Sequence, residues 1–351
     1  MIRFKYNEIA EWLKKNIDSG TYQNGDRLPA ENELAERFSV SRDTVRKAIH
    51  ILEKESLIIK VKGSGSYVNA SLTPNPMTFH NNSRQIGILM TNVNNYIFPS
   101  IVHGINKTLN YYNYTPAVYF SEDNISQERT ILTHFLNNNY AGLIIEPTRS
   151  ALPPSNYDLY QEICAKVPTI IIHAKFPMLK TPAITAGDEN AGFKLTKYLL
   201  DNGHRDIAAF FVFDQQTGTS RYLGFTKAFH NAGLTVNEEN IFWLPCDKVN
   251  SSFEYPLTED EKERIFKCSA IICFNDIIAL GIKRYLKNNN VEKDIMICGF
   301  DNSSISQEHN FTSVTHPQQK FGEFVAMRLL DYIKSPDQDV SFDFNPSLVI
   351  R

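Results

Sequence analysis

The sequence lacks any hydrophobic run of the ~18 residues that a membrane-spanning helix needs. Its longest apolar runs, such as 141–145 and 169–172, have the length of a β-strand. The beginning of the chain mixes charged and apolar residues, so we expect no signal peptide. The five cysteines are scattered without a C-x-x-C pair, which favours reduced, buried thiols over disulfides or a zinc site. We therefore expect a cytoplasmic protein that holds no metal and no cofactor and does not bind a membrane.

The sequence also lacks the common catalytic motifs. It contains no G-x-S-x-G, no H-E-x-x-H, no Walker A lysine loop, and no G-x-G-x-x-G after the first strand of its long C-terminal part. One enzymatic alternative remains, in which Glu146 and Asp301 form the acid/base pair of a glycosidase. Recognition of sugar hydroxyls explains the same two carboxylates without a reaction, so we expect a binding protein rather than an enzyme.

The composition is that of an ordinary folded protein, with 42% hydrophobic and 21% charged residues. The length of 351 residues predicts two or three domains. The net charge of −3 is unevenly distributed, because residues 1–70 carry two more basic than acidic residues and the remainder carries five more acidic ones. This asymmetry permits contact with nucleic acid at the N-terminal end.

The composition changes near residue 69, where a stretch rich in Pro, Asn, Ser and Thr shows neither helical nor strand periodicity. Such a stretch is typical of a linker. We therefore predict an N-terminal domain over 1–69, a linker over 70–84 and a large domain over 85–351.

Three helical patterns precede two short strands in the N-terminal domain. Apolar residues recur at helical spacing over 9–17, 30–38 and 45–52, and Ser41 is well placed to cap the third helix. The β-branched runs 57–61 and 66–68 flank a glycine-containing turn. This order predicts a winged helix-turn-helix.

In a helix-turn-helix, the N-terminal end of the second helix of the motif enters the major groove. Here Arg42, Asp43 and Arg46 lie on the face opposite the apolar positions, and Thr44 can donate to a phosphate. In the wing, Lys62, Gly63 and Gly65 could approach the minor groove. The alternative, a solvated basic helix face beside a plain hairpin, does not explain the turn, the cap and the wing glycines together.

The runs GDRLPAENELA (25–35), VSRDTVRKAI (40–49) and GSGSYV (63–68) resemble the GntR-type winged helix over nearly all of 1–69. The resemblance implies that Arg42, Thr44, Arg46 and Gly65 contact DNA. The sequence departs from the family where a DNA-contacting arginine is usual, because Asn32 occupies that position. This leaves open whether Glu31 or Asn32 supplies the contact from that helix.

The large domain alternates apolar runs with amphipathic helices. Strands are predicted over 85–90, 115–120, 141–145, 169–173, 206–212, 270–274 and 295–300, and helices include 125–136, 191–200 and 277–286. Alternation of this kind predicts α/β architecture with parallel sheets covered on both faces. A span of about 265 residues is large for one such unit and favours two lobes.

Polar and aromatic residues follow several of these strands at their carboxyl ends, where open parallel sheets bind ligands. They are Tyr96, Phe98, Glu146, His173, Asn275 and Asp301. Aromatic faces beside carboxylates and amides suit a sugar, whose C–H face stacks on a ring while its hydroxyls take hydrogen bonds. Individually, each residue could instead cap a helix or pack in a core.

The motifs DNGHRDIA (201–208), FNDIIALG (274–281) and CGFDN (298–302) resemble the LacI/GalR regulators and the periplasmic sugar-binding proteins, a likeness that covers 85–351. It implies a two-lobed fold like that of the periplasmic binding proteins, with the effector held between the lobes. The matching effector positions are Phe98, His173, Arg221, Asn275, Asp301 and His316.

The pairing of a GntR-type head with a LacI-type body, together with the runs 94–105, 142–151 and 312–317, is similar to the AraR-type arabinose-responsive repressors of Gram-positive bacteria. This similarity implies a homodimeric repressor that binds double-stranded operator DNA, takes L-arabinose as its effector and controls sugar-utilisation genes. Two alternatives are another mono- or oligosaccharide as effector, and a body that serves only for dimerisation.

Overall fold

The computed structural model describes residues 5–18, 21–22, 26–54, 57–61, 65–68, 83–92, 97–249, 257–291 and 293–351. Contacts divide the chain into two units, Met1–Thr78 and Phe79–Arg351. Residues 70–82 of the predicted linker lie outside the described residues, so the predicted domain boundaries stay predictions. None of the described helices is both long and apolar enough to cross a bilayer. All five cysteines are buried free thiols.

The first unit is the predicted winged helix. Its elements are α1 (Lys5–Asp18), α2 (Glu31–Phe38), α3 (Arg42–Lys54), β1 (Ile58–Val61) and β2 (Gly65–Val68). β1 and β2 pair antiparallel with Ile58 opposite Val68, and a bridge from Arg27 to Tyr67 extends the ribbon. The apolar faces of the three helices form one core around Leu13, Leu34 and Ile49.

Local hydrogen bonds set the ends of the two helices of the helix-turn-helix. The side chain of Glu33 accepts from the backbone N–H of Ala30 (3.0 Å) at the start of α2, and Ser39 ends that helix in the left-handed region with φ of 48°. Ser41 Oγ accepts from the backbone N–H of Thr44 (3.3 Å), so the predicted cap of α3 is present. The turn between the helices is Ser39–Ser41, which matches the predicted motif.

The second unit has two lobes, each built on a six-stranded sheet. The first sheet is parallel throughout, in the order β13-β7-β6-β5-β3-β4. Its strands are β3 (Gln85–Met90), β4 (Thr115–Phe120), β5 (Gly142–Ile145), β6 (Thr169–Ile172), β7 (Ala183–Thr185) and β13 (Phe342–Asp343). Its helices are α4 (Phe98–Tyr111), α5 (Ile125–Asn137), α6 (Tyr157–Lys166) and α12 (Gln318–Lys334).

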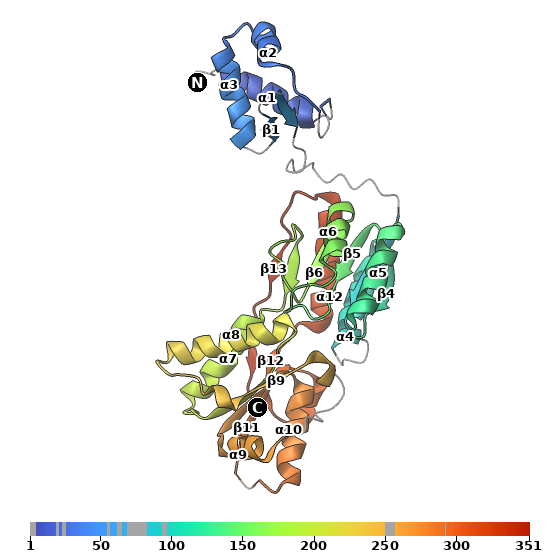
Figure 1. Cartoon of the computed structure of the whole chain (residues 1–351). Helices are drawn as coiled ribbons and strands as arrows, with labels where there is room; N and C mark the ends of the chain where they lie inside the picture. The colour runs from blue at the N-terminus through green and yellow to red at the C-terminus, as the bar shows by residue number, and fades with distance from the viewer. Residues whose placement is uncertain are drawn as a thin grey trace. The chain divides into compact units, whose positions relative to one another are not determined.

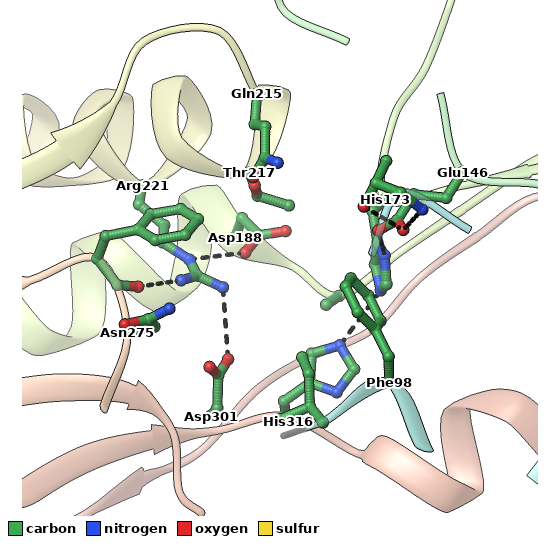
Figure 2. Close-up of a pocket in the computed structure, with 14 residues that line it drawn as sticks. Phe98, Glu146, His173, Asp188, Gln215, Thr217, Arg221, Asn275, Asp301 and His316 are labelled. Carbon is green, nitrogen blue, oxygen red and sulfur yellow. Dashed lines mark hydrogen bonds and ion pairs between the residues drawn. The ribbon is translucent and has the colours of Figure 1, made fainter. Parts of the chain in front are cut away.

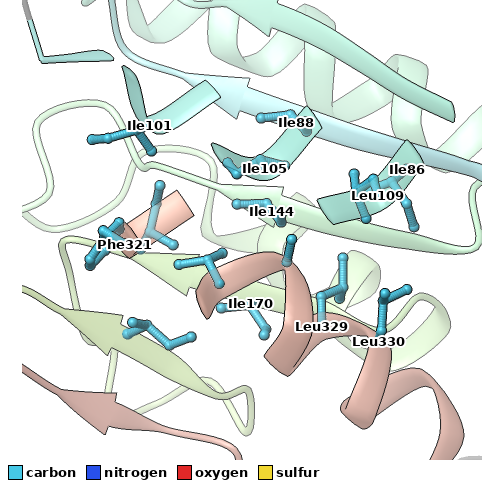
Figure 3. Close-up of a cluster of buried hydrophobic side chains, with 14 of the residues drawn as sticks. Ile86, Ile88, Ile101, Ile105, Leu109, Ile144, Ile170, Phe321, Leu329 and Leu330 are labelled. Atoms are coloured by element: carbon cyan, nitrogen blue, oxygen red, sulfur yellow. The ribbon is translucent and has the colours of Figure 1, made fainter. Parts of the chain in front are cut away.

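Helices cover both faces of this first sheet. Figure 3 shows one face, where Ile101 and Ile105 of α4 and Leu329 of α12 pack against strand residues such as Ile88 and Ile144. On the other face α5 and α6 pack through a separate buried cluster. The strands are therefore apolar on both sides, which explains their nearly continuous Val/Ile/Leu runs.

The second sheet has the order β14-β12-β11-β10-β8-β9 and is parallel except for β14. Its strands are β8 (Ile207–Val212), β9 (Ile241–Leu244), β10 (Ala270–Cys273), β11 (Met296–Asp301), β12 (Thr312–Thr315) and β14 (Leu348–Val349). Its helices are α7 (Asp188–Asp201), α8 (Gln216–Asn231), α9 (Glu259–Lys267), α10 (Asp276–Asn288) and α11 (Ser304–Glu308), with short 3₁₀ turns at Glu238–Asn240 and Cys246–Lys248.

The chain passes between the lobes three times, at 185–188, 315–318 and 343–348. Consequently α12, drawn in red near the C-terminal end of the sequence, lies among the green elements of the first lobe (Figure 1). The predicted parallel α/β body with two lobes is confirmed, although the sequence did not indicate β7, β9, β12, β13 or β14.

Candidate functional site

A pocket lies between the two lobes, at the carboxyl ends of their parallel strands. Its empty volume is about 510 Å³, a figure that includes open solvent. Its lining comprises Thr91, Ile97, Phe98, Glu146, His173, Ala186, Asp188, Gln215, Thr217, Arg221, Phe274, Asn275, Asp301 and His316. Figure 2 shows Glu146, His173 and Phe98 on one side of this pocket and Arg221, Asp188 and Asn275 on the other.

Arg221 of α8 is held on three sides. Its Nε donates to Asp188 Oδ1 (2.9 Å), one terminal nitrogen donates to the carbonyl oxygen of Phe274, and the other lies 3.8 Å from Asp301 Oδ1. The guanidinium also lies over the rings of Phe274 (4.9 Å) and Phe300 (4.3 Å). With a rigid fork fixed in this way, Arg221 can present its remaining donors to a hydroxyl without further ordering cost.

Two glycines bring Arg221 and Asp188 together. α7 and α8 pack closely, and a Cβ at Gly192 would collide with the carbonyl oxygen of Arg221. A Cβ at Gly224 would collide with the carbonyl oxygen of Glu189. The close helix contact therefore depends on these two small residues and places the first turn of α7 beside the side chain of Arg221.

Asp301 ends β11 with a positive φ of 95°, a strained conformation for a residue with a side chain. Behind it lies Asp276, which is fully buried and accepts hydrogen bonds from Ser303 (N–H 2.8 Å, Oγ 2.7 Å) and from Ser313 Oγ (2.7 Å). Burial, followed by the charge of Asp301, raises the pKa of Asp276 to about 6. Asp276 thus joins Ser303, two residues after Asp301, to Ser313 of the neighbouring strand β12.

On the side of the first lobe, Glu146 organises three groups. Its Oε2 accepts from the backbone N–H (3.0 Å) and the hydroxyl (2.8 Å) of Thr91, and its Oε1 lies 2.7 Å from Nδ1 of His173. The ring of His173 stacks on Phe321 with centroids 4.7 Å apart. His173 itself has a positive φ of 57°. These contacts fix the orientation of the imidazole at the edge of the pocket.

A chain of hydrogen bonds orders the ring nitrogens of the two histidines. The backbone N–H of Gln318 donates to Nδ1 of His316 (2.9 Å), so the proton of a neutral His316 ring lies on Nε2. This Nε2 lies 3.3 Å from Nε2 of His173, which leaves the proton of His173 on Nδ1, facing Glu146. Burial lowers the pKa of His316 well below its usual value, and the charge of Arg221 lowers it further. Both rings are thus engaged within the protein, and the carboxylates and the guanidinium are the stronger partners for a ligand.

Asn275 and Phe98 serve the fold as well as the pocket. Asn275 Oδ1 accepts from the backbone N–H of Ile278 (2.9 Å), so Asn275 caps α10, and its amide nitrogen donates to the carbonyl of Val249 (3.3 Å). Phe98 is the first residue of α4 and packs in the core of the first lobe. Its ring centroid lies 6.5 Å from that of His173. A cap or a core position at the end of a strand is therefore compatible with a place in the pocket wall.

The structure brings seven of the eight predicted effector residues to this pocket, and Tyr96 lies outside the described residues. Sequence reasoning missed Thr91, Asp188, Gln215 and Thr217, which also line it. Asp188 follows Gly187, whose φ of 77° turns the chain from β7 into α7. The small residues before Asp188 were the available signal for this turn.

The predicted DNA-reading face of the first unit is exposed. The side chains of Arg42, Asp43 and Arg46 project from the first turns of α3 and are at least half exposed. The hydroxyl of Thr44 lies 2.9 Å from that of Ser41. Gly65 has φ of 132°, and a Cβ there would lie 2.9 Å from Nε of Arg27, so this wing position requires glycine. Lys62 and Gly63 lie outside the described residues.

Glu31 of α2 holds the basic side chains of this face together. Its carboxylate lies 2.9 Å from Arg46, 3.4 Å from Lys60 and 4.0 Å from Arg42. Burial alone would raise the pKa of Glu31, but the hydrogen bonds and charges of Arg46 and Lys60 outweigh it and lower the pKa. In the absence of DNA, therefore, Glu31 offsets the repulsion among these cations.

Comparison with known families identifies both parts of the chain. Residues 5–68 match the bacterial regulatory proteins of the gntR family. Residues 196–351 match the periplasmic binding protein-like domain.

Relatives match the chain over almost its whole length. An arabinose metabolism transcriptional repressor from Halalkalibacterium halodurans is 29% identical over 359 residues, covering 99% of this chain and 96% of that protein. A repressor of the same name from Geobacillus stearothermophilus is 30% identical over 355 residues, with the same coverage. Among solved structures, a periplasmic binding protein/LacI transcriptional regulator from Alkaliphilus metalliredigens in complex with D-xylulofuranose is 21% identical, covering 77% of this chain and 98% of its own, with a TM-score of 0.64. The last of these shows a shared fold.

Proposed function

The chain belongs to the family of arabinose metabolism transcriptional repressors, and we propose that it releases operator DNA when L-arabinose binds between the lobes of residues 85–351. The observation that carries the proposal is the pocket of buried carboxylates around one fixed guanidinium, in a chain whose first unit is a winged helix. Because the relatives are repressors, the chain is a regulator rather than an enzyme. Glu146 and Asp301 are then groups that bind hydroxyls.

A pentose suits the chemistry of this pocket. Carboxylate oxygens of Asp188, Asp301 and Glu146 accept from sugar hydroxyls, and the guanidinium of Arg221 donates to them. The ring of Phe98 offers an apolar face to the C–H side of the sugar. The pocket needs both the accepting carboxylates and the donating guanidinium, because each sugar hydroxyl is a donor and an acceptor at once.

We assign operator binding to residues 1–69. The side chains proposed to contact DNA are Glu31, Arg42, Asp43, Thr44, Arg46 and Lys62, with the backbone at Gly63 and Gly65 in the wing. An arginine that forks onto a guanine contributes about 1–3 kcal/mol of discrimination. Arg42→Ala should therefore weaken operator binding by about 1–3 kcal/mol in a gel-shift titration. The matched control is Lys54→Ala at the other end of α3, which should bind as the unchanged protein does. If Arg42→Ala also binds as tightly as the unchanged protein, Arg42 does not belong to the interface.

We further propose that the repressor acts as a homodimer on two half-sites. The first lobe carries an apolar groove between α4 and the edge strand β4, which includes Val102, Pro116 and Val118. A second copy of this chain would cover it and contact the edge strand β4. Sedimentation should give a dimer for the unchanged chain and a monomer for Val118→Asp; a dimer in both would place the interface elsewhere.

Calorimetric titration with a panel of pentoses and hexoses tests the effector. L-Arabinose should release or absorb heat with a single site per chain, and the sugar should be recovered unchanged. Preference for another mono- or oligosaccharide would keep the architecture and change the effector. A converted sugar would contradict the regulator, and no binding of any sugar would leave a body that serves only for dimerisation.

A further inference from the structure

Gln216, the first residue of α8, connects the two lobes outside the pocket. Its Nε2 donates to the carbonyl oxygens of Ser150 (2.9 Å) and Lys175 (3.0 Å), and its Oε1 accepts from the backbone N–H of Lys175 (2.8 Å). Its own backbone N–H donates to Ser150 Oγ (3.0 Å). α8 belongs to the second lobe, whereas Ser150 and Lys175 belong to the first, so all four hydrogen bonds cross between lobes.

These hydrogen bonds do not involve the pocket itself. The neighbours of Gln216 in sequence, Gln215 and Thr217, line the pocket, whereas Gln216 does not. Ala151 N–H donates to the carbonyl of Asp214 (3.1 Å) and extends the same contact by one further bond. The residues of this contact follow β5, β6 and β8, whereas the three crossings of the chain follow β7, β12 and β13. The covalent connections therefore do not hold the contact together, and it forms only when the lobes approach one another.

The partners in the first lobe are held rigidly. Buried Glu128 accepts from the backbone N–H of Thr148 and from the hydroxyl of Tyr160, both at 2.7 Å, which fixes the loop that carries Ser150. Lys175 lies two residues after His173, whose ring is fixed by Glu146. Because the acceptors are preorganised, the carboxamide gains its hydrogen bonds at little cost in loop entropy.

We infer that Gln216 is a positioning residue that latches the lobes together and so sets the affinity of the pocket for its sugar without touching the sugar. The inference rests on the proposed function. In an open arrangement of the lobes, the polar groups of Gln216, Ser150 and Lys175 would form hydrogen bonds with water instead. The latch therefore stabilises only the closed arrangement. A carboxamide fits because it donates twice and accepts once at the same site, whereas a carboxylate cannot donate at all.

Gln216→Met, which keeps the length, and Gln216→Glu, which removes both donors, test the latch in the full chain with L-arabinose as the probe. Both variants should bind the sugar about 10-fold or more weakly, because several hydrogen bonds are lost from the closed form only. The loss should lie in faster dissociation measured by stopped flow, with an unchanged association rate. Gln161→Met on the exposed face of α6 is the matched control and should behave as the unchanged protein does.

Two further measurements separate a latch from a fold defect. Without sugar, the variants should still unfold in one cooperative transition, and the radius of gyration should increase in solution scattering. Their operator affinity without sugar should be equal or higher, because the open arrangement is the one proposed to hold DNA. A sugar affinity within twofold of the unchanged chain for both variants, with an unchanged radius of gyration, would overturn the latch. If the unchanged chain binds no sugar, the proposed function fails, and scattering alone decides the latch.

Discussion

The side chain of Arg221 is 7% exposed and provides the positive charge beside two buried carboxylates, those of Asp188 and Asp301. The charged groups of the pocket therefore hold one another in place, and a sugar can bind them without rearranging them. Removing one of these charged side chains lowers the stability of the fold strongly, because its partner is left as an unpaired buried charge. Recognition and stability depend on the same residue.

Arg221→Met should lower the free energy of unfolding in urea by about 3–5 kcal/mol, since Asp188 and Asp301 lose their counter-charge. Adding Asp188→Asn to this variant should recover part of the loss, and neither protein should show heat on titration with sugar. An unchanged stability together with normal sugar binding in Arg221→Met would contradict the assigned role of this side chain.

Asp123 predicts a dependence of stability on pH. Burial, followed by the charges of Glu146 and Asp214, raises the pKa of Asp123 from 3.8 to about 6. Between these values the folded chain holds a proton that the unfolded chain has lost, so the free energy of unfolding falls as pH rises from about 4 to about 6. Above pH 6 the full cost of the buried charge is present.

Asp123→Asn removes this cost. Relative to the unchanged chain, the variant should be about as stable at pH 4 and more stable at pH 7, by at most about 3 kcal/mol. Asp158 gives the contrast, because a hydrogen bond from Arg129 lowers its pKa. Asp158→Asn should therefore be less stable than the unchanged chain at pH 7, and this difference should shrink as the pH falls. A parallel pair of stability curves for Asp123→Asn and the unchanged chain would rule out the raised pKa.

At the scale of elements, the contact of α7 with α8 determines where the pocket charges lie. Gly224→Ala should push the two helices apart and cost about 1–3 kcal/mol of unfolding free energy, as overpacking does. It should also weaken sugar binding, because Asp188 and Arg221 sit on opposite helices. The control is Gly233→Ala, where φ of 69° is strained but no atom lies within 4 Å of the added Cβ, so stability should fall without loss of sugar affinity.

Elements with a strong period were predictable from the sequence, and short ones were not. β3 and β4 lie where their apolar runs predict, and Ser41 caps α3 as expected. β7 has three residues and β13 and β14 have two each, too few for any period to appear. Asp188 was missed for this reason, because no strand end was predicted before it and the next helix was predicted only from residue 191.

At the scale of the whole molecule, the triple crossing hides from sequence reasoning which strand belongs to which lobe. The seven predicted residues that line the pocket lie between residues 98 and 316, and only the fold brings Glu146 of one lobe opposite Arg221 of the other. His173 and Asp301 were predictable as residues at strand ends, whereas Arg221 and His316 followed from family resemblance alone. The crossings also explain how a ligand held between lobes could alter both at once.

The central claim is that sugar in the pocket weakens the grip on DNA. Fluorescence anisotropy of a labelled operator, titrated with the full chain at fixed salt, measures it most directly. We predict that saturating L-arabinose weakens operator binding by about 5- to 150-fold, the usual range of allosteric coupling. Equal affinity with and without L-arabinose, in a chain that binds the sugar in calorimetry, would contradict the account.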